Sequence, residues 1–481
     1  MSIFLGIDLG TSSVKVLAVG DGKILNSVSR DYDVSYPKAN YSEQNPLDWY
    51  DQTIEALKEL LSGIDRNSVE AVSFSGQMHG LVMLDSDDNV IRPAILWNDG
   101  RSVKEVDYLN NQIGKDTLLD KTGNIAFAGF TAPKLLWVKN NETENFNKAA
   151  KIMLPKDYLA YRLSGEFTTD VSDASGTLYF DVKNRVWSDY MLELIGINES
   201  QLPKVYESNT VVGTLKPSIA SELGLGENVR IVIGAGDNAA SAVGTGMVKD
   251  GNCNISLGTS GTIYVESKEC NYDKESAIHV FDSANGGYHY LACILSAASC
   301  QKWWIEKILK TDYNMSGLDK YLGKNTVCFL PYLMGERSPI NNPEAKAVLL
   351  GMTPATTQEE MTLAILEGVA YALRQNIDII KALGTNVEKS KVCGGGTKNK
   401  LWLKIIANVL NITLEIPKQD TGGALGAALL AAKGVLDCDE YNKLAEGFYE
   451  IDNIITPEAE MVEAYDNLYK NYLEYQKNLY K

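Results

Sequence analysis

A six-residue motif with phosphate-binding character occurs twice in the chain. Residues 7–12 are Ile-Asp-Leu-Gly-Thr-Ser, and residues 255–260 are Ile-Ser-Leu-Gly-Thr-Ser. The apolar runs around each copy predict a strand, a tight turn and a second strand. Such a turn presents backbone N–H groups and hydroxyls to a phosphate, because glycine allows close backbone approach. An ordinary hairpin turn would explain one copy, but two copies half a chain apart favour two related lobes that each face a phosphate.

A carboxylate follows the buried strand predicted at residues 229–233. The next residues, 234–239, are Gly-Ala-Gly-Asp-Asn-Ala, so Asp237 lies at a corner between strand and helix. The string fits the dinucleotide fingerprint G-x-G-x-x-A, although the helix predicted after it is short. The corner would also allow Asp237 to point into a cleft as a general base. Capping of the helix is the third interpretation of this residue.

Polar residues follow two further predicted strands. Residues 75–80 are Ser-Gly-Gln-Met-His-Gly, and His79 is one of three histidines in the chain. The flanking glycines indicate close backbone approach, and Gln77 and His79 suit hydroxyl groups, although an internally satisfied histidine is the alternative. Residues 97–101 are Trp-Asn-Asp-Gly-Arg. Here an internal Asp99–Arg101 ion pair and a substrate role that includes Trp97 stay equally open.

Three consecutive glycines, residues 394–396, follow the strand predicted at residues 391–393. They leave room for a flat ligand against bare backbone, with Asn399 available to hydrogen-bond it. A flexible loop is the alternative. The strand before the glycines and the helix predicted at residues 401–410 favour a fixed corner.

Composition excludes several classes of function. The chain has 481 residues and a net charge of −17, which argues against a nucleic-acid or anionic-membrane surface. The seven cysteines are scattered, so neither a zinc site nor a disulfide framework is indicated. No apolar run approaches the ~20 residues that span a bilayer, and we expect a cytoplasmic protein. The absence of G-x-x-x-x-G-K-[ST] disfavours a Walker-type NTPase.

Four helices are predicted around these motifs. Pro46 precedes an amphipathic helix predicted at residues 49–61, and residues 357–360 form a capping box that starts another helix. Residues 422–428 are small and predict a helix suited to close packing. The tail, residues 457–481, has a tyrosine stripe that predicts a docked terminal helix.

The two hairpins, the Asp237 corner, the capped helix and the three glycines occur in an order that resembles the FGGY carbohydrate kinases. Residues 129–140 are similar to the first signature of that family, and residues 351–367 are similar to the second. The resemblance covers almost the whole chain. It implies an α/β, two-lobed fold of the actin/hexokinase/Hsp70 (ribonuclease H-like) type, with a cleft between the lobes. We expect a sugar-binding lobe at residues 1–246, an ATP-binding lobe at 247–440 and a docked helical tail at 441–481.

Within this family, residues 75–80 resemble the sugar-binding motif of the members that phosphorylate D-xylulose. The resemblance implies that Met78 and His79 contact the ketose, with help from Asn238. It implies that Asp237 takes the proton from the attacking 5-hydroxyl group, with D-xylulose 5-phosphate as product. Ribulose, gluconate or glycerol would be the substrate of a sister kinase.

The same resemblance assigns the nucleotide and metal sites. Asp8, the carboxylate that only the first motif carries, would hold Mg²⁺. The phosphates of ATP would meet the residues of both turns, Gly10, Thr11, Ser12, Gly258, Thr259 and Ser260. The adenosine would lie against Gly395, Gly396 and Asn399, and the family suggests a homodimer. A nucleotide-gated binding protein of the Hsp70 or actin type, or a nicotinamide dehydrogenase that uses residues 234–239, is the alternative from another class.

Overall fold

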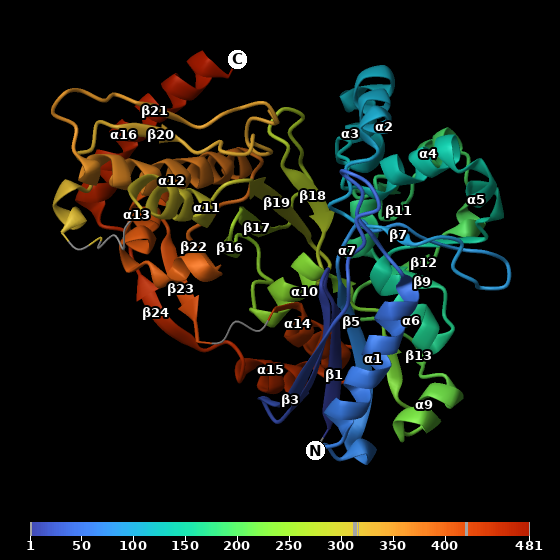
Figure 1. Ribbon diagram of the computed structural model, residues 1–481. Coiled ribbons are helices and arrows are strands. Elements are labelled where there is room, and N and C mark those ends of the chain that lie inside the picture. Colours follow the sequence, from blue (N-terminus) through green and yellow to red (C-terminus); the bar gives the residue numbers. More distant parts are fainter. Residues whose placement is uncertain (1, 311–314, 316, 419–421, 481) are drawn as a thin grey trace. The chain divides into compact units, whose positions relative to one another are not determined.

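The computed structural model describes residues 2–310, 315, 317–418 and 422–480 (Figure 1). The chain forms two compact units. The first contains Met1–Val248, Val280–Tyr288 and Thr421–Glu450, and the second contains Lys249–His279, His289–Asp420 and Ile451–Lys481. These units differ from the predicted lobes at residues 1–246 and 247–440 and from the predicted tail at 441–481, because the segment Thr421–Glu450 groups with the N-terminal unit.

The first unit is built on a sheet with strand order β13-β14-β5-β1-β2-β3, in which β15 also pairs with β5. Strand β1 (Ile3–Leu9) is antiparallel to β2 (Ser13–Gly20) and parallel to β5 (Val69–Gly76), which is parallel to β15 (Ala235–Gly236). The carboxyl ends of β1, β5 and β15 consequently meet at one edge of the sheet. The other strands are β3 (Lys23–Asp31), β13 (Val211–Thr214) and β14 (Arg230–Val232).

Both faces of this sheet are covered (Figure 1). Alternate residues of β1 belong to two different cores, since successive side chains of a strand point to opposite faces. Helix α1 (Pro46–Leu61) packs into the core that contains Ile3 and Leu5, and α14 (Gly422–Lys433) packs into the core that contains Phe4. Helix α1 begins three residues before the predicted start because Pro46 occupies its first turn.

Glycines allow α14 to lie close to its neighbours, as the small residues of this segment predicted. A Cβ on Gly6 of β1 would come within 2.0 Å of the Ala424 carbonyl oxygen. A Cβ on Gly426 would come within 1.7 Å of the carbonyl oxygen of Ala240, which belongs to α10 (Asp237–Gly244). These contacts attach α14 to the first unit.

The second unit repeats the hairpin of the first. Its sheet contains the order β19-β17-β16-β22-β23-β24. Strand β16 (Cys253–Leu257) is antiparallel to β17 (Gly261–Ser267) and parallel to β22 (Lys389–Cys393). Ser256 lies opposite Cys393, as Asp8 lies opposite Ser75 in the first unit. The sequence repeat is therefore also a repeat of supersecondary structure. The other strands are β19 (Tyr288–Ile294), β23 (Thr413–Pro417) and β24 (Ile451–Ile455).

Two predicted helices flank this second sheet. Helix α12 (Gln358–Ala382) starts at the capping box, where Thr357 and Glu360 bond each other's backbone. Helix α16 (Ala459–Leu479) buries Tyr465, Tyr469 and Tyr472, which confirms a docked terminal helix. Across the described ranges, no helix has the length and hydropathy needed to cross a membrane.

Candidate active site

The residues predicted to bind the sugar and to act as general base lie at the carboxyl ends of three parallel strands of the first unit. In the register of the sheet, Ser75 of β5 lies between Asp8 of β1 and Ala235 of β15. The chain leaves β5 and β15 directly after this level, so Met78, His79 and Asp237 follow at the same edge. Ligand sites of α/β proteins commonly lie outside the carboxyl ends of such strands.

Asp8 is a partly buried carboxylate with a fixed orientation. Ser75 Oγ donates a hydrogen bond of 2.7 Å to Asp8 Oδ1. Burial raises the pKa of Asp8, whereas the Ser75 hydrogen bond and the Lys15 charge act in the opposite direction. Gly423 of α14 lies directly against this pair, because a Cβ there would come within 2.7 Å of Asp8 Oδ1. The carboxylate thus has a defined position beside the first turn.

The first turn, residues 10–12, is held from several sides. Tyr32 Oη donates to the Gly10 carbonyl at 2.6 Å, and Gln44 Nε2 donates to the Thr11 carbonyl at 2.7 Å. Trp97 Nε1 donates to Thr11 Oγ1 at 2.9 Å. Ser12 is exposed at the tip. The turn is an ordered platform with hydroxyls at its surface.

Asp237 is the first residue of α10, whose N-cap is Gly236. Both the backbone N and Nδ2 of Asn238 donate to Asp237 Oδ1, at 2.8 and 2.9 Å. Burial, together with the nearby charge of Asp8, raises the pKa of Asp237 to about 7. Helix capping, one of the three interpretations, does not describe this residue. A carboxyl group that titrates near neutrality suits general base chemistry.

The Gly236 backbone is held by a buried network that the sequence did not indicate. Gly236 N donates to Ser172 Oγ at 3.1 Å, and Ser172 Oγ donates to Asp170 Oδ2 at 2.5 Å. Lys156 Nζ lies 3.1 Å from Asp170 Oδ1 and 2.7 Å from Asp157 Oδ1. These side chains are buried and support the corner that carries Asp237.

His79 has a left-handed backbone, with φ of 69°. Its Nδ1 lies 2.7 Å from the Gly176 carbonyl oxygen. Because a carbonyl can only accept, Nδ1 donates this hydrogen bond and carries a proton. The ring packs against Phe130 at 4.9 Å and Phe281 at 5.9 Å between centroids. Gly176 and the two phenylalanines are site residues that sequence reasoning missed, because nothing local to them refers to His79.

Met78 is buried beside His79, and its Sδ lies 3.8 Å from Nδ2 of Asn238. The structure therefore brings Met78 and His79 of one strand end together with Asp237 and Asn238 of another. This group contains an imidazole ring, an amide and a carboxylate. Such groups can bind and deprotonate a hydroxylic ligand.

Asp99 and Arg101 form an internal ion pair, which was one of the two interpretations of residues 97–101. Arg101 Nη2 lies 2.8 Å from Asp99 Oδ2, Nη1 lies 2.7 Å from Glu43 Oε1, and all three side chains are largely buried. The guanidinium also stacks on Tyr41 at 3.9 Å. Trp97, in contrast, is 45% exposed. Trp97 and Asn98 are therefore the exposed side chains of this loop, whereas Asp99 and Arg101 are committed to the ion pair.

In the second unit, the second turn adjoins α11 (Ala298–Trp303). Backbone N–H groups of Ala298 and Ala297 donate to the carbonyls of Gly258 and Thr259, each at 2.9 Å. Gly394 has φ of 88°, and a Cβ there would lie 2.8 Å from the Leu257 carbonyl oxygen. The three-glycine corner therefore lies against the end of the strand that precedes the second turn.

A pocket of about 400 Å³ opens beside this corner. Its lining residues are Ala298, Gln301, Lys302, Ile305, Glu306, Gly395, Gly396, Lys398 and Asn399. A Cβ on Gly395 would meet no atom within 4 Å. Asn399 Oδ1 accepts from Trp402 N at 3.1 Å and caps α13 (Lys400–Leu410). Gly395 and Gly396 thus begin a 3₁₀ turn (Gly395–Lys398) between β22 and α13, with open space beside Gly395.

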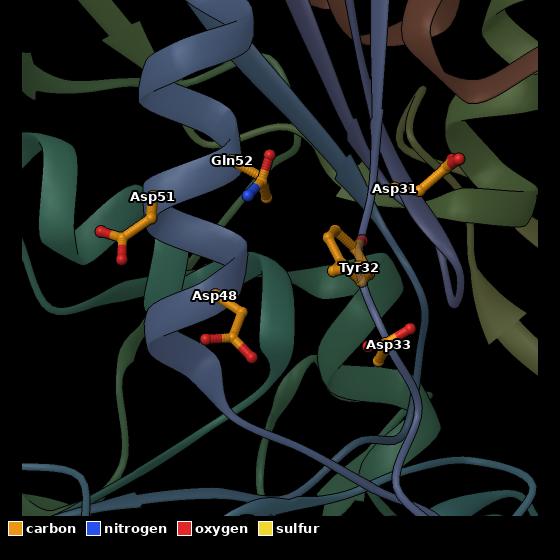
Figure 2. A pocket seen from close by; sticks show the side chains of 6 residues that line it. All are labelled: Asp31, Tyr32, Asp33, Asp48, Asp51 and Gln52. Atoms are coloured by element: carbon orange, nitrogen blue, oxygen red, sulfur yellow. The ribbon is translucent and has the colours of Figure 1, made fainter.

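A second hollow, of about 330 Å³, lies between α1 and the segment after β3 (Figure 2). It is lined by Asp31, Tyr32, Asp33, Asp48, Asp51 and Gln52. Among the residues that the structure describes, no three His, Cys, Asp or Glu side chains are grouped to hold a metal ion. Tyr32 links the hollow to the first turn, because its Oη donates to the Gly10 carbonyl.

Comparisons with known proteins agree with these features. The FGGY family of carbohydrate kinases matches with its N-terminal domain over residues 3–244 and its C-terminal domain over 253–435. The xylulose kinase of Escherichia coli (strain K12) is 41% identical over 437 residues, which are 89% of each chain. A crystal structure of a xyloylose kinase from Brucella ovis has a TM-score of 0.91 at 37% identity and covers 99% of each chain. A gluconate kinase from Lactobacillus acidophilus also has a TM-score of 0.91, at 27% identity, over 99% of this chain and 98% of its own. The predicted two-lobed α/β fold is confirmed.

Proposed function

Because this chain belongs to the FGGY family of carbohydrate kinases, we propose that it transfers the γ-phosphoryl group of ATP to D-xylulose and forms D-xylulose 5-phosphate. The observation that carries the proposal is the gathering of Met78, His79, Asp237 and Asn238 at one sheet edge beside Asp8. The xylulose kinase of E. coli supports the choice of sugar. The gluconate kinase from Lactobacillus acidophilus has the same TM-score as the xyloylose kinase, so the fold by itself does not identify the sugar.

In this mechanism Asp237 accepts the proton of the attacking hydroxyl group. Phosphoryl transfer depends mainly on positioning and charge neutralisation, and a positioned base adds to them. Nδ1 of His79 is hydrogen-bonded to the Gly176 carbonyl, so the ring would orient the sugar through its Nε2 side. Met78 and the Asn238 amide complete the sugar contacts.

The residues around Asp8 fit a magnesium ion. Mg²⁺ typically takes one or two carboxylates and completes its octahedron with waters and substrate phosphates. The charge of Asp8 raises the pKa of Asp237, and a cation nearby would relieve that repulsion. Asp8 would hold the ion, which when bound neutralises charge on the phosphoryl oxygens. Thr11 and Ser12 would contact the transferring group.

The nucleotide would use the second unit. Gly258 and Thr259 would contact phosphates at the second turn. The 400 Å³ pocket at Gly395, Gly396 and Asn399 would take the adenosine, because it combines bare backbone with an amide. A homodimer and a cytoplasmic location stay predictions.

A substrate panel tests the proposed function. ADP release is measured with D-xylulose, D-ribulose, D-gluconate and glycerol, each with and without Mg²⁺. We expect the highest kcat/KM for D-xylulose and no turnover without the metal. A higher kcat/KM for any of the other three would replace D-xylulose as the substrate.

Turnover should depend on pH through Asp237. Only the ionised carboxylate can accept a proton, and the pKa of Asp237 is raised to about 7. We therefore expect kcat/KM for D-xylulose to fall about tenfold per pH unit on the acidic side of the Asp237 pKa and to level off above it, with the midpoint below 7 once Mg²⁺ relieves the repulsion from Asp8. Initial rates between pH 5 and 9 check this, with circular dichroism to verify that the fold persists. A flat acidic limb would contradict the assignment.

Gly395→Ala should weaken nucleotide binding without unfolding the protein. The added methyl group would enter open space, so it occupies volume assigned to adenosine. We expect the KM of ATP to rise about five- to tenfold, with the KM of D-xylulose unchanged. Gly226→Ala, whose methyl group also meets no atom within 4 Å, is the control in the first unit. An unchanged KM for ATP would place the adenosine elsewhere.

A further inference from the structure

Lys134 is a fully buried lysine on the first turn of α4 (Thr131–Asn141). Its ammonium group folds back over the start of its own helix, where a cation is disfavoured by the helix dipole. A buried charge needs partners, and these partners are three backbone carbonyls. Nζ donates to Phe130 and to His79, each at 3.2 Å, and makes a short bond to Gly129. An ammonium has three N–H donors, so this arrangement uses all of them.

The His79 carbonyl is the acceptor that connects Lys134 to the candidate active site. Thr131 Oγ1 donates to the same oxygen at 3.1 Å, so two side chains of α4 hold it. His79 has a left-handed backbone, which non-glycine residues adopt only when their surroundings enforce it. Its ring also packs on Phe130, whose carbonyl Lys134 binds. Lys134 therefore joins the turn that carries His79 to the residue that supports its ring.

Two charged side chains act on the pKa of Lys134 in opposite directions. Burial lowers this pKa to about 7, the charge of Asp99 opposes the shift, and the charge of Arg101 adds to it. The three carbonyls add a further preference for the ammonium, because a neutral amine would point a lone pair at one of them. The Asp99–Arg101 loop thus has a second role as the charged surroundings of Lys134.

We propose that Lys134 is a positioning residue that fixes the His79 turn and thereby sets the affinity and selectivity for the sugar. The proposal rests on the proposed function, since it requires that His79 contacts the sugar. It predicts a defect in sugar binding that leaves the nucleotide and the proton transfer nearly unaffected.

The central variant is Lys134→Met, which keeps the length of the side chain and removes its donors. We expect the KM of D-xylulose to rise about tenfold or more, because hydrogen bonds from a charged group are lost. The kcat and the KM of ATP should stay within about twofold. The variant should also discriminate less between D-xylulose and D-ribulose.

Lys139→Met is the matched control on the same helix. Lys139 Nζ also donates to a backbone carbonyl, that of Ile195, at 2.5 Å, but it has no bond to His79. We expect its kinetic constants to equal those of the parent protein. A rise in the sugar KM of this variant would show that any disturbance of α4 suffices, and it would overturn the specific role of Lys134.

Thr131→Val tests the role of the His79 carbonyl independently, in case Lys134→Met does not fold. It removes one hydroxyl from the His79 carbonyl at nearly constant shape, and we expect the KM of D-xylulose to rise about three- to fivefold. Because both side chains share one acceptor, the double variant should deviate from the product of the single effects. Multiplicative effects, or a Thr131→Val KM equal to that of the parent protein, would contradict the shared role.

His79→Ala, measured in parallel, separates this inference from the proposed function. If it leaves the sugar KM unchanged, the assignment of His79 is wrong and both proposals fall. If it raises the sugar KM while Lys134→Met does not, only the positioning role is wrong. A higher KM for D-xylulose in both His79→Ala and Lys134→Met supports the inference. The thermal midpoint of Thr131→Val should at the same time equal that of the parent protein.

Discussion

Replacing Asp237 with asparagine is expected to lower kcat by about 10²- to 10⁴-fold, the usual contribution of a positioned general base. The amide keeps the shape of the carboxylate, and its oxygen can still accept from Asn238. It cannot take the proton of the attacking hydroxyl group. The KM of D-xylulose should therefore stay within about threefold. Initial rates of ADP release and calorimetric titration with D-xylulose measure the two effects separately.

Asp437→Asn is the control for this variant. Asp437 is an exposed helix N-cap of α15 (Cys438–Glu446), and its side chain accepts from Glu440 N at 2.9 Å. Asparagine caps helices about as well as aspartate, so neither kcat nor stability should change much. If Asp237→Asn retained a kcat near that of the parent protein, the transfer would not depend on this base. Asp237 would then be a sugar-binding residue only.

Gly426→Ala is expected to produce the largest loss of stability. Its Cβ would lie 1.7 Å from the carbonyl oxygen of Ala240, so α10 and α14 would have to move apart along their backbones. Such overpacking costs about 3 kcal/mol or more, since no flexible side chain can give way. For a unit of this size that corresponds to a fall of about 6–12 °C in the first thermal transition. Differential scanning calorimetry measures this.

The variant also tests which unit contains α14. If Thr421–Glu450 belongs to the first unit, the transition that shifts should be the one that D-xylulose stabilises. Gly226→Ala, with no atom within 4 Å of the added methyl group, should leave the midpoint unchanged or slightly raised. An unchanged midpoint for Gly426→Ala would mean that the two helices separate at no cost.

Much of the candidate site could be predicted because its chemistry lies in short segments. Asp8 lies near the end of a buried strand, and His79 and Asp237 each follow one. A strand end followed by glycine and polar residues is visible in the sequence within a few positions. The repeat of residues 7–12 at 255–260 likewise required no knowledge of contacts. It predicted the paired hairpins that both sheets contain.

Other interpretations could not be decided until the packing was known. Asp99 and Arg101 are two residues apart, so either a pair or a ligand site fitted the sequence. The structure shows that both are buried with Glu43 and form an ion pair with each other. The all-round apolar helix α14 carried no sign of its partner, so its place against Gly6 and Ala240 in the first unit became known only from the packing.

The sequence by itself determined the family, the two related halves and the polar residues at the strand ends. These follow from local order, because strand and turn preferences act over a few neighbouring residues. Only the tertiary structure decided what supports those residues. His79 meets Gly176 and Lys134, and Gly236 meets Ser172, over separations of 55 to 97 residues. Such contacts depend on strand register and on how the connections cross the sheet, and no local pattern specifies either.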